Sequence, residues 1–330
     1  MQEALLHLLF IVMILIITLA QDLHALEVFS AIKKLGYKNV YIVEADKIST
    51  QCPLSIRIGQ SKNQLISSKI TTNNGEIVDI ENCKTIWVRR PFAKQIDEKD
   101  RSPSELEYIS NECKSGIGSI ISASNFKGNW VSHPDATIKS SDKILQLKTA
   151  LEVGFKIPKT LVSQSKKDIL EFYKECNRKI IVKPLLGVSD KFLETKQLKN
   201  PNSVSKEAYT ICPAIYQELI PGHKHIRLNS FGSYKKAALI EADNLDWRSN
   251  LNIPISEWTI PASLAKSIDN ILNRLGLAMG VFDFKLNDKD ELVWFEVNPQ
   301  GQFLFLEPFL KVNLAENFAR FLIEKTKDIN

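Results

Sequence analysis

One stretch near the C-terminus constrains the fold more than any other: GVFDFKLNDKDELVWFEVNPQGQ, residues 280–302. Residues 281–286 and 292–297 are rich in β-branched and aromatic side chains, and the polar residues 287–290 between them favour a turn. The stretch therefore predicts a β-hairpin. Its acids lie within apolar strands, where they cannot simply be solvated.

The register of this hairpin decides which side chains meet. A loop with an even number of residues pairs Leu286 with Glu291. Counting back from that pair places Asp283 opposite Trp294 and diagonal to Glu296. A loop with an odd number of residues would turn Asp283 to the opposite face.

Three oxygen-bearing side chains converge in this register. Because strand side chains alternate, Asn298 lies on the face of Glu296, beside Asp283. Such oxygen ligands suit Mg²⁺ shared with the phosphates of a nucleotide. The alternative is a solvated hairpin with incidental acids, but Glu296 stands between Phe295 and Val297, which argues against it.

The composition bounds the remaining possibilities. A chain of 330 residues can form two or three domains. A net charge of +5, with no basic run interleaved with aromatic residues, argues against nucleic acid as a partner. The five cysteines are scattered and form no Cys-x-x-Cys pair, which fits a reducing cytoplasm and gives no zinc site or disulfide framework. We therefore expect a cytoplasmic protein.

Residues 4–20 are almost wholly apolar and raise the possibility of a signal or membrane segment. However, Glu3 precedes the segment without any Lys or Arg, His7 interrupts it, and it is short for a membrane span. We expect residues 1–12 to be an extension, residues 13–18 to begin a buried first strand, and no membrane attachment.

The chain from residue 13 begins with a strand, a helix that Asp22 can cap, and a second strand at 40–43. This order indicates a parallel α/β layer. Residues 13–134 are predicted to form the first domain, with residues 130–134 as the loop that closes it.

Residues 135–330 are predicted to be α+β, with residues 135–213 as a central subdomain and residues 214–330 as a C-terminal one. The predicted elements here are a helix at 141–153, strands at 179–183 and 215–220, a hairpin at 226–242, and helices at 261–275 and 313–325.

Several cationic side chains are open to two interpretations. Lys183 ends an apolar strand before Pro184, so it either holds phosphate oxygens as a point charge or lies in solvent. Arg89 and Arg90 follow a strand and either hold an anion or form surface ion pairs. No general base is identifiable from these residues. His223 and His225 are expected on the surface.

The order of these features resembles the ATP-grasp ligases. The features that match are Lys143 on a helix, the strand-end pair Lys183-Pro184, the strand Gln217–Ile220, the pair Arg227 and Arg248, and the set Asp283, Glu296 and Asn298. A narrower likeness, to the microviridin-type graspetide ligases that cyclise ribosomal peptides, lies in Trp87–Pro91, His133-Pro134, Ile157–Leu161, Asp246-Trp247-Arg248 and Asn298–Gln302. The resemblance implies an N-terminal α/β pre-ATP-grasp domain followed by two α+β subdomains that clasp a nucleotide.

The resemblance also assigns roles. It implies that Lys143 and Lys183 bind the phosphates of ATP. It implies that Gln217, Glu218, Leu219 and Ile220 meet the adenine mainly through backbone groups, that Asp283, Glu296 and Asn298 hold Mg²⁺, and that Arg227 and Arg248 neutralise the γ-phosphate and an acyl phosphate.

The implied activity is that of an ADP-forming ligase. A peptide Asp or Glu side chain would be activated as an acyl phosphate and joined to a hydroxyl or amine in an ester or amide macrocycle. The implied partners are a precursor peptide with a leader segment and a second copy of the chain in a homodimer. Residues 186–212 are glycine-poor, and we hypothesise that they help to recruit the leader. The alternatives are an ATP-grasp amino-acid or small-peptide ligase and a nucleotide-binding scaffold without catalysis.

Overall fold

The structure is a computed structural model that describes the chain except for residues 1–12, 60–65, 96–100, 187–192, 194 and 328–330. The predicted extension at residues 1–12, and part of the segment for which leader recruitment was hypothesised, lie outside the described residues. The described part of that segment is folded in places. It contains β10 (Lys196–Gln197), a 3₁₀ turn at Pro201–Ser203 and α7 (Lys206–Thr210).

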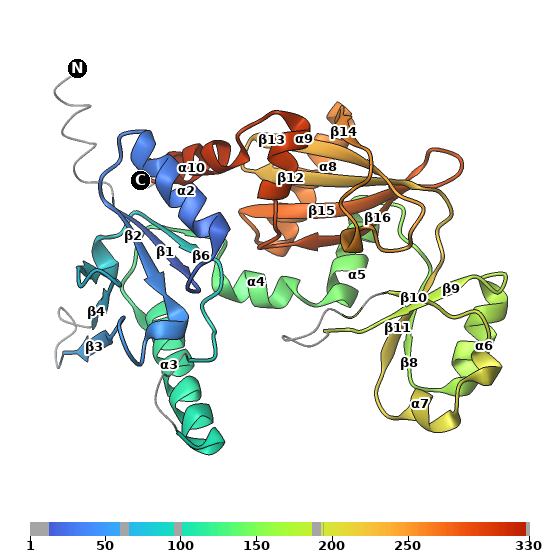
Figure 1. The fold of residues 1–330 in the computed structure, drawn as a ribbon, viewed down its shortest axis with the longest axis horizontal. Coiled ribbons are helices and arrows are strands. Elements are labelled where there is room, and N and C mark those ends of the chain that lie inside the picture. Colours follow the sequence, from blue (N-terminus) through green and yellow to red (C-terminus); the bar gives the residue numbers. More distant parts are fainter. Residues whose placement is uncertain (1–12, 60–65, 96–100, 187–192, 194, 328–330) are drawn as a thin grey trace.

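The N-terminal part is built on a parallel sheet with the strand order β2-β1-β6-β7 (Figure 1). Its strands are β1 (Ile14–Thr18), β2 (Val40–Glu44), β6 (Thr85–Val88) and β7 (Asn129–Val131), and its main helices are α2 (Leu23–Lys34) and α3 (Pro103–Ala123). All five residues of β1 are buried, so the prediction of a buried first strand is confirmed. Asp22 caps α2 by accepting a hydrogen bond from the backbone N–H of His24, as expected.

Residues 130–134 were predicted to be a closing loop, but the first two of them belong to a strand. Asn129–Val131 is the fourth strand of the sheet, and Ile86 pairs with Trp130. A strand of three residues is too short to leave a period in the sequence. A second, antiparallel sheet lies beside this one and consists of β3 (Leu54–Ile58), β4 (Ile66–Thr71) and β5 (Ile77–Asp79).

Two helices, α4 (Pro134–Ser140) and α5 (Lys143–Val153), lead to a small antiparallel sheet with the strand order β10-β9-β11-β8 (Figure 1). The remaining strands of this sheet are β8 (Thr160–Ser163), β9 (Ile180–Lys183) and β11 (Ala214–Glu218), and α6 (Lys166–Glu175) packs against it. Helix α5 ends at Gly154 in the left-handed conformation, as glycine permits. Leu147 of this helix is buried, whereas its apolar residues Ile144 and Leu151 are exposed.

The C-terminal part is a five-stranded antiparallel sheet with the strand order β14-β13-β12-β15-β16. Its elements are β12 (Lys224–Phe231), β13 (Tyr234–Glu241), β14 (Ile255–Trp258), α8 (Ala262–Leu275), β15 (Met279–Leu286), β16 (Leu292–Asn298), α9 (Glu307–Leu310) and α10 (Leu314–Lys325). The predicted hairpins at 226–242 and 280–302 and the predicted helices at 261–275 and 313–325 are all present here.

The two faces of this sheet pack against different parts of the molecule. Phe282, Phe284 and Trp294 point to one face and pack with apolar residues of α5 and α8. Val281, on the opposite face, belongs to a core that also contains Trp87 of β6. The N-terminal and C-terminal sheets therefore share one continuous apolar core.

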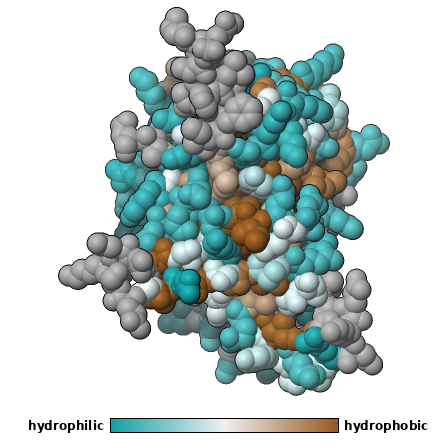
Figure 2. Space-filling view, turned by 90° about the vertical axis from the view of Figure 1, so that its left-hand side faces the viewer, coloured by the Kyte–Doolittle hydropathy of each residue, from teal (hydrophilic) through white to brown (hydrophobic). Residues whose placement is uncertain are grey.

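Figure 2 looks onto the N-terminal side of the molecule and shows apolar side chains in small groups separated by polar ones. Within the described part of the chain, no helix is long and apolar enough to cross a membrane.

Candidate active site

The hairpin of β15 and β16 has a different register from the one expected. Leu286 pairs with Leu292, so the loop has an odd number of residues, and Phe284 rather than Asp283 pairs with Trp294. A β-bulge follows between Phe284 and Asp283, and it brings Asp283 directly opposite Glu296. The odd loop alone would place Asp283 and Glu296 on opposite faces of the hairpin. The extra residue of the bulge returns them to the same face. The prediction that Asp283 and Glu296 share a face therefore holds through a different pairing.

Asp283 and Glu296 form an acidic corner that is partly compensated by Arg227 on the neighbouring strand β12. One guanidinium nitrogen of Arg227, Nη1, donates to both carboxylate oxygens of Asp283, at 2.8 and 2.7 Å. Burial raises the pKa of the Asp283 carboxyl, Arg227 opposes that rise, and the negative charge of Glu296 adds to it. Two adjacent carboxylates at one place repel each other, and a divalent cation between them would relieve that repulsion.

Asn298 ends β16 and pairs in register with Val281, two residues before Asp283. Its side-chain oxygen accepts a hydrogen bond from the backbone N–H of Gln300 at 3.1 Å. Asn298 is exposed and is not among the residues that line the pocket described below. No group of three or more His, Cys, Asp or Glu side chains in the described residues could hold a metal. A magnesium site here must therefore combine the two carboxylates with an amide oxygen or with ligands from outside the chain.

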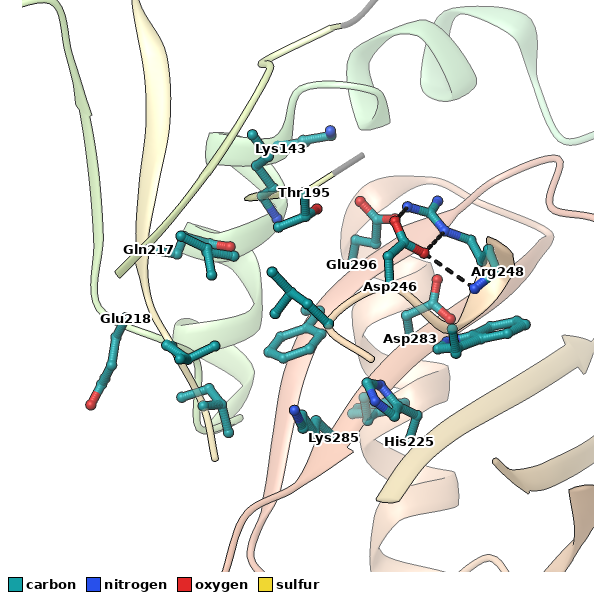
Figure 3. Close-up of a pocket in the computed structure, with 18 of the residues that line it drawn as sticks. Lys143, Thr195, Gln217, Glu218, His225, Asp246, Arg248, Asp283, Lys285 and Glu296 are labelled. Carbon is teal, nitrogen blue, oxygen red and sulfur yellow. Dashed lines mark hydrogen bonds and ion pairs between the residues drawn. The ribbon is translucent and has the colours of Figure 1, made fainter. Parts of the chain in front are cut away.

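A cavity of about 480 Å³ lies between the small central sheet and the C-terminal sheet, and Asp283 and Glu296 line it. Figure 3 shows the two sides facing one another, with Lys143, Thr195 and Gln217 on one side and Glu296, Asp246, Arg248 and Asp283 on the other. The structure thus brings residues from α5, β9, β11, β15 and β16 to one pocket.

The two lysines predicted to bind the phosphates of ATP line this pocket. Burial lowers the pKa of Lys183, and the nearby cations Lys143 and Arg248 lower it further, whereas Glu296 raises it. The ammonium group of Lys143 donates to the carbonyl oxygen of Pro184 at 3.4 Å, just beyond Lys183. Two lysines at one place repel each other unless an anion lies between them, so the pair suits a polyphosphate.

Arg248 lies on a 3₁₀ turn (Trp247–Ser249) and forms a two-point ion pair with Asp246. Its Nε and Nη2 atoms donate to the two carboxylate oxygens at 2.8 and 2.7 Å. This pairing raises the pKa of Arg248 and fixes the plane of its guanidinium. Arg248 therefore reaches the pocket as an oriented cation, whereas Arg227 lies behind Asp283 and outside the pocket lining.

The strand expected to meet adenine also borders the pocket. Gln217, Glu218, Leu219 and Ile220 all line it, together with Ile181 and Phe295 as apolar neighbours from opposite sheets. The side-chain amide of Gln217 donates to Thr160 at 2.9 Å, which holds that side chain against β8.

Two titratable side chains that line the pocket, His225 and Lys285, were not assigned to it from the sequence. His225, expected on the surface, is buried and lines the pocket, and burial lowers its pKa to about 4. It pairs across the sheet with Lys285, whose pKa burial also lowers. Both residues share the face of Asp283 by strand alternation, so the register of β12 and β15 was the signal that could have found them. His223 is half-exposed, in agreement with expectation.

The arginines after β6 behave differently from each other. Arg89 is buried, and its Nε lies 2.7 Å from Oδ2 of Asp22 in an ion pair. Arg89 therefore fits neither of the two interpretations given above, a site for an anion or a surface ion pair. Arg90 is exposed, and its Nε lies 3.9 Å from Oδ2 of Asp22.

Comparison with known proteins supplies the context for this geometry. Residues 13–125 match the family model of the MvdD pre-ATP grasp domain. Among solved structures, the macrocyclase MdnC of Microcystis aeruginosa MRC, bound with the precursor peptide MdnA, superposes with a TM-score of 0.81 at 23% identity and covers 94% of this chain and 99% of its own. The chain has an ATP-grasp fold.

Two further structures share this ATP-grasp fold. A RiPP-associated ATP-grasp ligase of Chryseobacterium gregarium, in complex with ADP and a leader and core peptide, has a TM-score of 0.83 at 21% identity and covers 95% of this chain and 97% of its own. The ATP-grasp ligase PsnB, complexed with minimal precursor, Mg and ADP, has a TM-score of 0.74 at 18% identity, with coverage of 95% and 97%. No curated protein matched this chain. The predicted order of a pre-ATP-grasp domain followed by an ATP-grasp fold is confirmed.

Proposed function

We propose that this protein is an ADP-forming ligase that activates a side-chain carboxylate of a ribosomally made peptide and joins it to a hydroxyl or amine of the same peptide. The observation that carries the proposal is the pocket itself. It places Lys143 and Lys183 on the side of the central sheet and Arg248, with the acidic pair Asp283 and Glu296, on the other side, in an ATP-grasp fold. The proposed domains are those predicted above, at residues 13–134, 135–213 and 214–330.

The distribution of apolar and cationic side chains along the pocket supports one orientation of ATP. The adenine would lie at Gln217–Ile220 between Ile181 and Phe295, where edge-on backbone groups and apolar faces are available. The triphosphate would extend toward Lys143 and Lys183 and end near Arg248.

The acidic corner would hold magnesium. Asp283, Glu296 and Asn298 supply hard oxygen ligands, and Arg227 orients the carboxylate of Asp283 and opposes the rise in its pKa that burial causes. When bound, magnesium supplies charge neutralisation and alignment for the phosphate oxygens. Phosphoryl transfer depends chiefly on such positioning and on fixed cations rather than on a strong base.

Two displacements account for the reaction. In the first, a carboxylate oxygen of the peptide attacks the γ-phosphorus, the bond to the β–γ bridging oxygen breaks, and ADP leaves with that oxygen. In the second, a hydroxyl or amine attacks the acyl carbon, the bond to the phosphate oxygen breaks, and phosphate leaves while the nucleophile loses its proton. Lys183 and Arg248 would stabilise the negative charge that develops in each step.

The choice of a peptide as substrate rests on the structural relatives. MdnC is bound with a precursor peptide, and the Chryseobacterium ligase is bound with a leader and core peptide. D-cycloserine synthetase DcsG also shares the fold, but with a lower TM-score of 0.57 at 15% identity. We propose a precursor peptide with a leader as the partner, a homodimer as the assembly, and the cytoplasm as the location.

Incubation of the purified protein with ATP, Mg²⁺ and a precursor peptide encoded beside its gene tests this function. We expect each ring to lower the peptide mass by one water, about 18 Da, and to release one ADP. Release of AMP, or ADP release without any change in the mass of the peptide, would contradict the proposal. A linear dipeptide or an amino-acid adduct would instead favour the small-peptide ligase.

A further inference from the structure

The loop that follows Asn298 is held from the N-terminal domain, not only from the sheet that carries the acidic corner. Residues 298–304 leave β16 and run against β6 and α2 before the 3₁₀ turn Leu304–Leu306. Gln300 is the centre of this contact, and three of its polar groups are engaged.

Each of these three contacts of Gln300 has a separate partner. The indole N–H of Trp87 donates to its side-chain oxygen at 3.0 Å. The Nη1 atom of Arg89 donates to its backbone oxygen at 3.1 Å. Its own backbone N–H donates to Oδ1 of Asn298 at 3.1 Å. The orientation of the Asn298 amide therefore depends on a residue that the N-terminal domain fixes in place.

Arg89 is itself held rigidly. Its Nε donates to Asp22 at 2.7 Å, and Asp22 also accepts from the hydroxyl of Thr18 at 2.8 Å and caps α2. The side chain of Arg89 is fully buried, so the ion pair is shielded from water and salt. Such a buried, charge-assisted network holds its geometry more firmly than exposed pairs do.

The same loop is fixed at two more places. Nε2 of His24 accepts hydrogen bonds from the backbone N–H groups of Phe303 and Leu304, at 3.0 and 3.3 Å. Burial, with Arg89 nearby, lowers the pKa of His24 to about 4, so the ring is neutral at pH 7 and Nε2 can accept. From the other side, Nη2 of Arg227 donates to the backbone oxygen of Gln302 at 2.9 Å.

Gly301 packs closely against Val281 of β15. A Cβ atom at this residue would lie 2.6 Å from the Cβ of Val281 and 3.2 Å from that of Asn298. The backbone is thus pressed onto β15 beside the acidic corner, while Trp87 and Arg89 hold it from the opposite side.

We infer that Arg89 and Trp87 of the N-terminal domain are positioning residues for the metal corner, because they orient the amide of Asn298 through Gln300. This inference rests on the proposed magnesium site. The pre-ATP-grasp domain would then be required for metal affinity and not only for contact with a peptide. Partners that orient a metal ligand typically contribute about 10- to 100-fold to metal affinity.

The test measures Mn²⁺ as a probe of the metal site, by electron paramagnetic resonance, with the full-length protein and saturating ADP. We expect Arg89→Gln to weaken Mn²⁺ binding by about 10-fold or more, and Trp87→Phe, which loses only the indole donor, to weaken it by a smaller factor. The affinity for ADP without metal should stay unchanged in both. Arg90→Gln is the matched control, because Arg90 is exposed and its ion pair with Asp22 is long.

Asn298→Ala serves as the reference for loss of the ligand. Wild-type Mn²⁺ affinity in both Arg89→Gln and Trp87→Phe, with a loss in Asn298→Ala, would overturn the inference and leave the proposed function standing. Unchanged affinity in Asn298→Ala itself would remove the metal assignment and the inference together. If Arg89→Gln fails to fold, Trp87→Phe decides, because phenylalanine keeps the ring that packs on Phe318.

Discussion

Glu296→Gln is expected to fold normally and to lose about 100-fold or more in kcat/KM for ADP formation with the peptide. Such a loss corresponds to about 2.7 kcal/mol of transition-state stabilisation. Glutamine has nearly the same shape as glutamate but removes the negative charge that would balance a divalent cation. The fold should not suffer, because Glu296 faces Asp283 directly and its charge raises the pKa of that carboxyl. The melting temperature without metal should therefore be unchanged or slightly higher.

Glu291→Gln is the matched control for this change. Glu291 belongs to the loop of the same hairpin, and its exposed carboxylate pairs with Lys156 at 2.6 Å. Exposed pairs of this kind contribute little to stability and should contribute nothing to turnover. Steady-state kinetics over a range of Mg²⁺ concentrations provide the measurement. Equal kcat/KM in the Glu296→Gln and Glu291→Gln proteins would contradict the role of the acidic corner.

Lys183→Met is expected to remove most of the binding of ADP and ATP while leaving the unliganded fold as stable as the wild type, or more stable. Burial and the neighbouring cations Lys143 and Arg248 lower the pKa of Lys183, so its charge is unfavourable in the empty pocket. The same charge becomes favourable when phosphates arrive. We expect the nucleotide affinity to fall by about 100-fold and the rise in melting temperature caused by ADP to be largely lost.

Lys179→Met is the control for removal of a lysine. Lys179 is exposed and immediately precedes β9, four residues before Lys183. Differential scanning fluorimetry with and without ADP compares the two variants. A thermal shift in Lys183→Met as large as that of Lys179→Met would show that Lys183 does not bind phosphate.

The sequence predicted the order of the elements well because their ends carry local signals. Asp22 caps α2, Gly154 ends α5, and a two-residue turn joins Phe231 to Tyr234, all through contacts between near neighbours. The placement of Asp283 beside Glu296 was predicted for a partly wrong reason. An odd loop and a β-bulge at Phe295 cancel one another, and alternation alone cannot reveal a bulge.

The features that the sequence could not predict depend on contacts between distant segments. His225 is buried only because Lys285 pairs with it across the sheet and the central subdomain covers the pocket. Arg89 meets Gln300 across 211 residues of chain, so nothing near Arg89 distinguishes it from the exposed Arg90. The contact between Arg89 and Gln300 forms because the N-terminal and C-terminal sheets share one core.

The central claim is that a peptide carboxylate attacks the γ-phosphate of ATP at the pocket between Lys183 and Glu296. A precursor peptide whose Asp and Glu side chains carry ¹⁸O tests it most directly, with mass spectrometry of the released phosphate. The account predicts one ¹⁸O atom in the phosphate for each ring formed, because the carboxylate oxygen leaves with the phosphoryl group. Ring formation accompanied by unlabelled phosphate would contradict it.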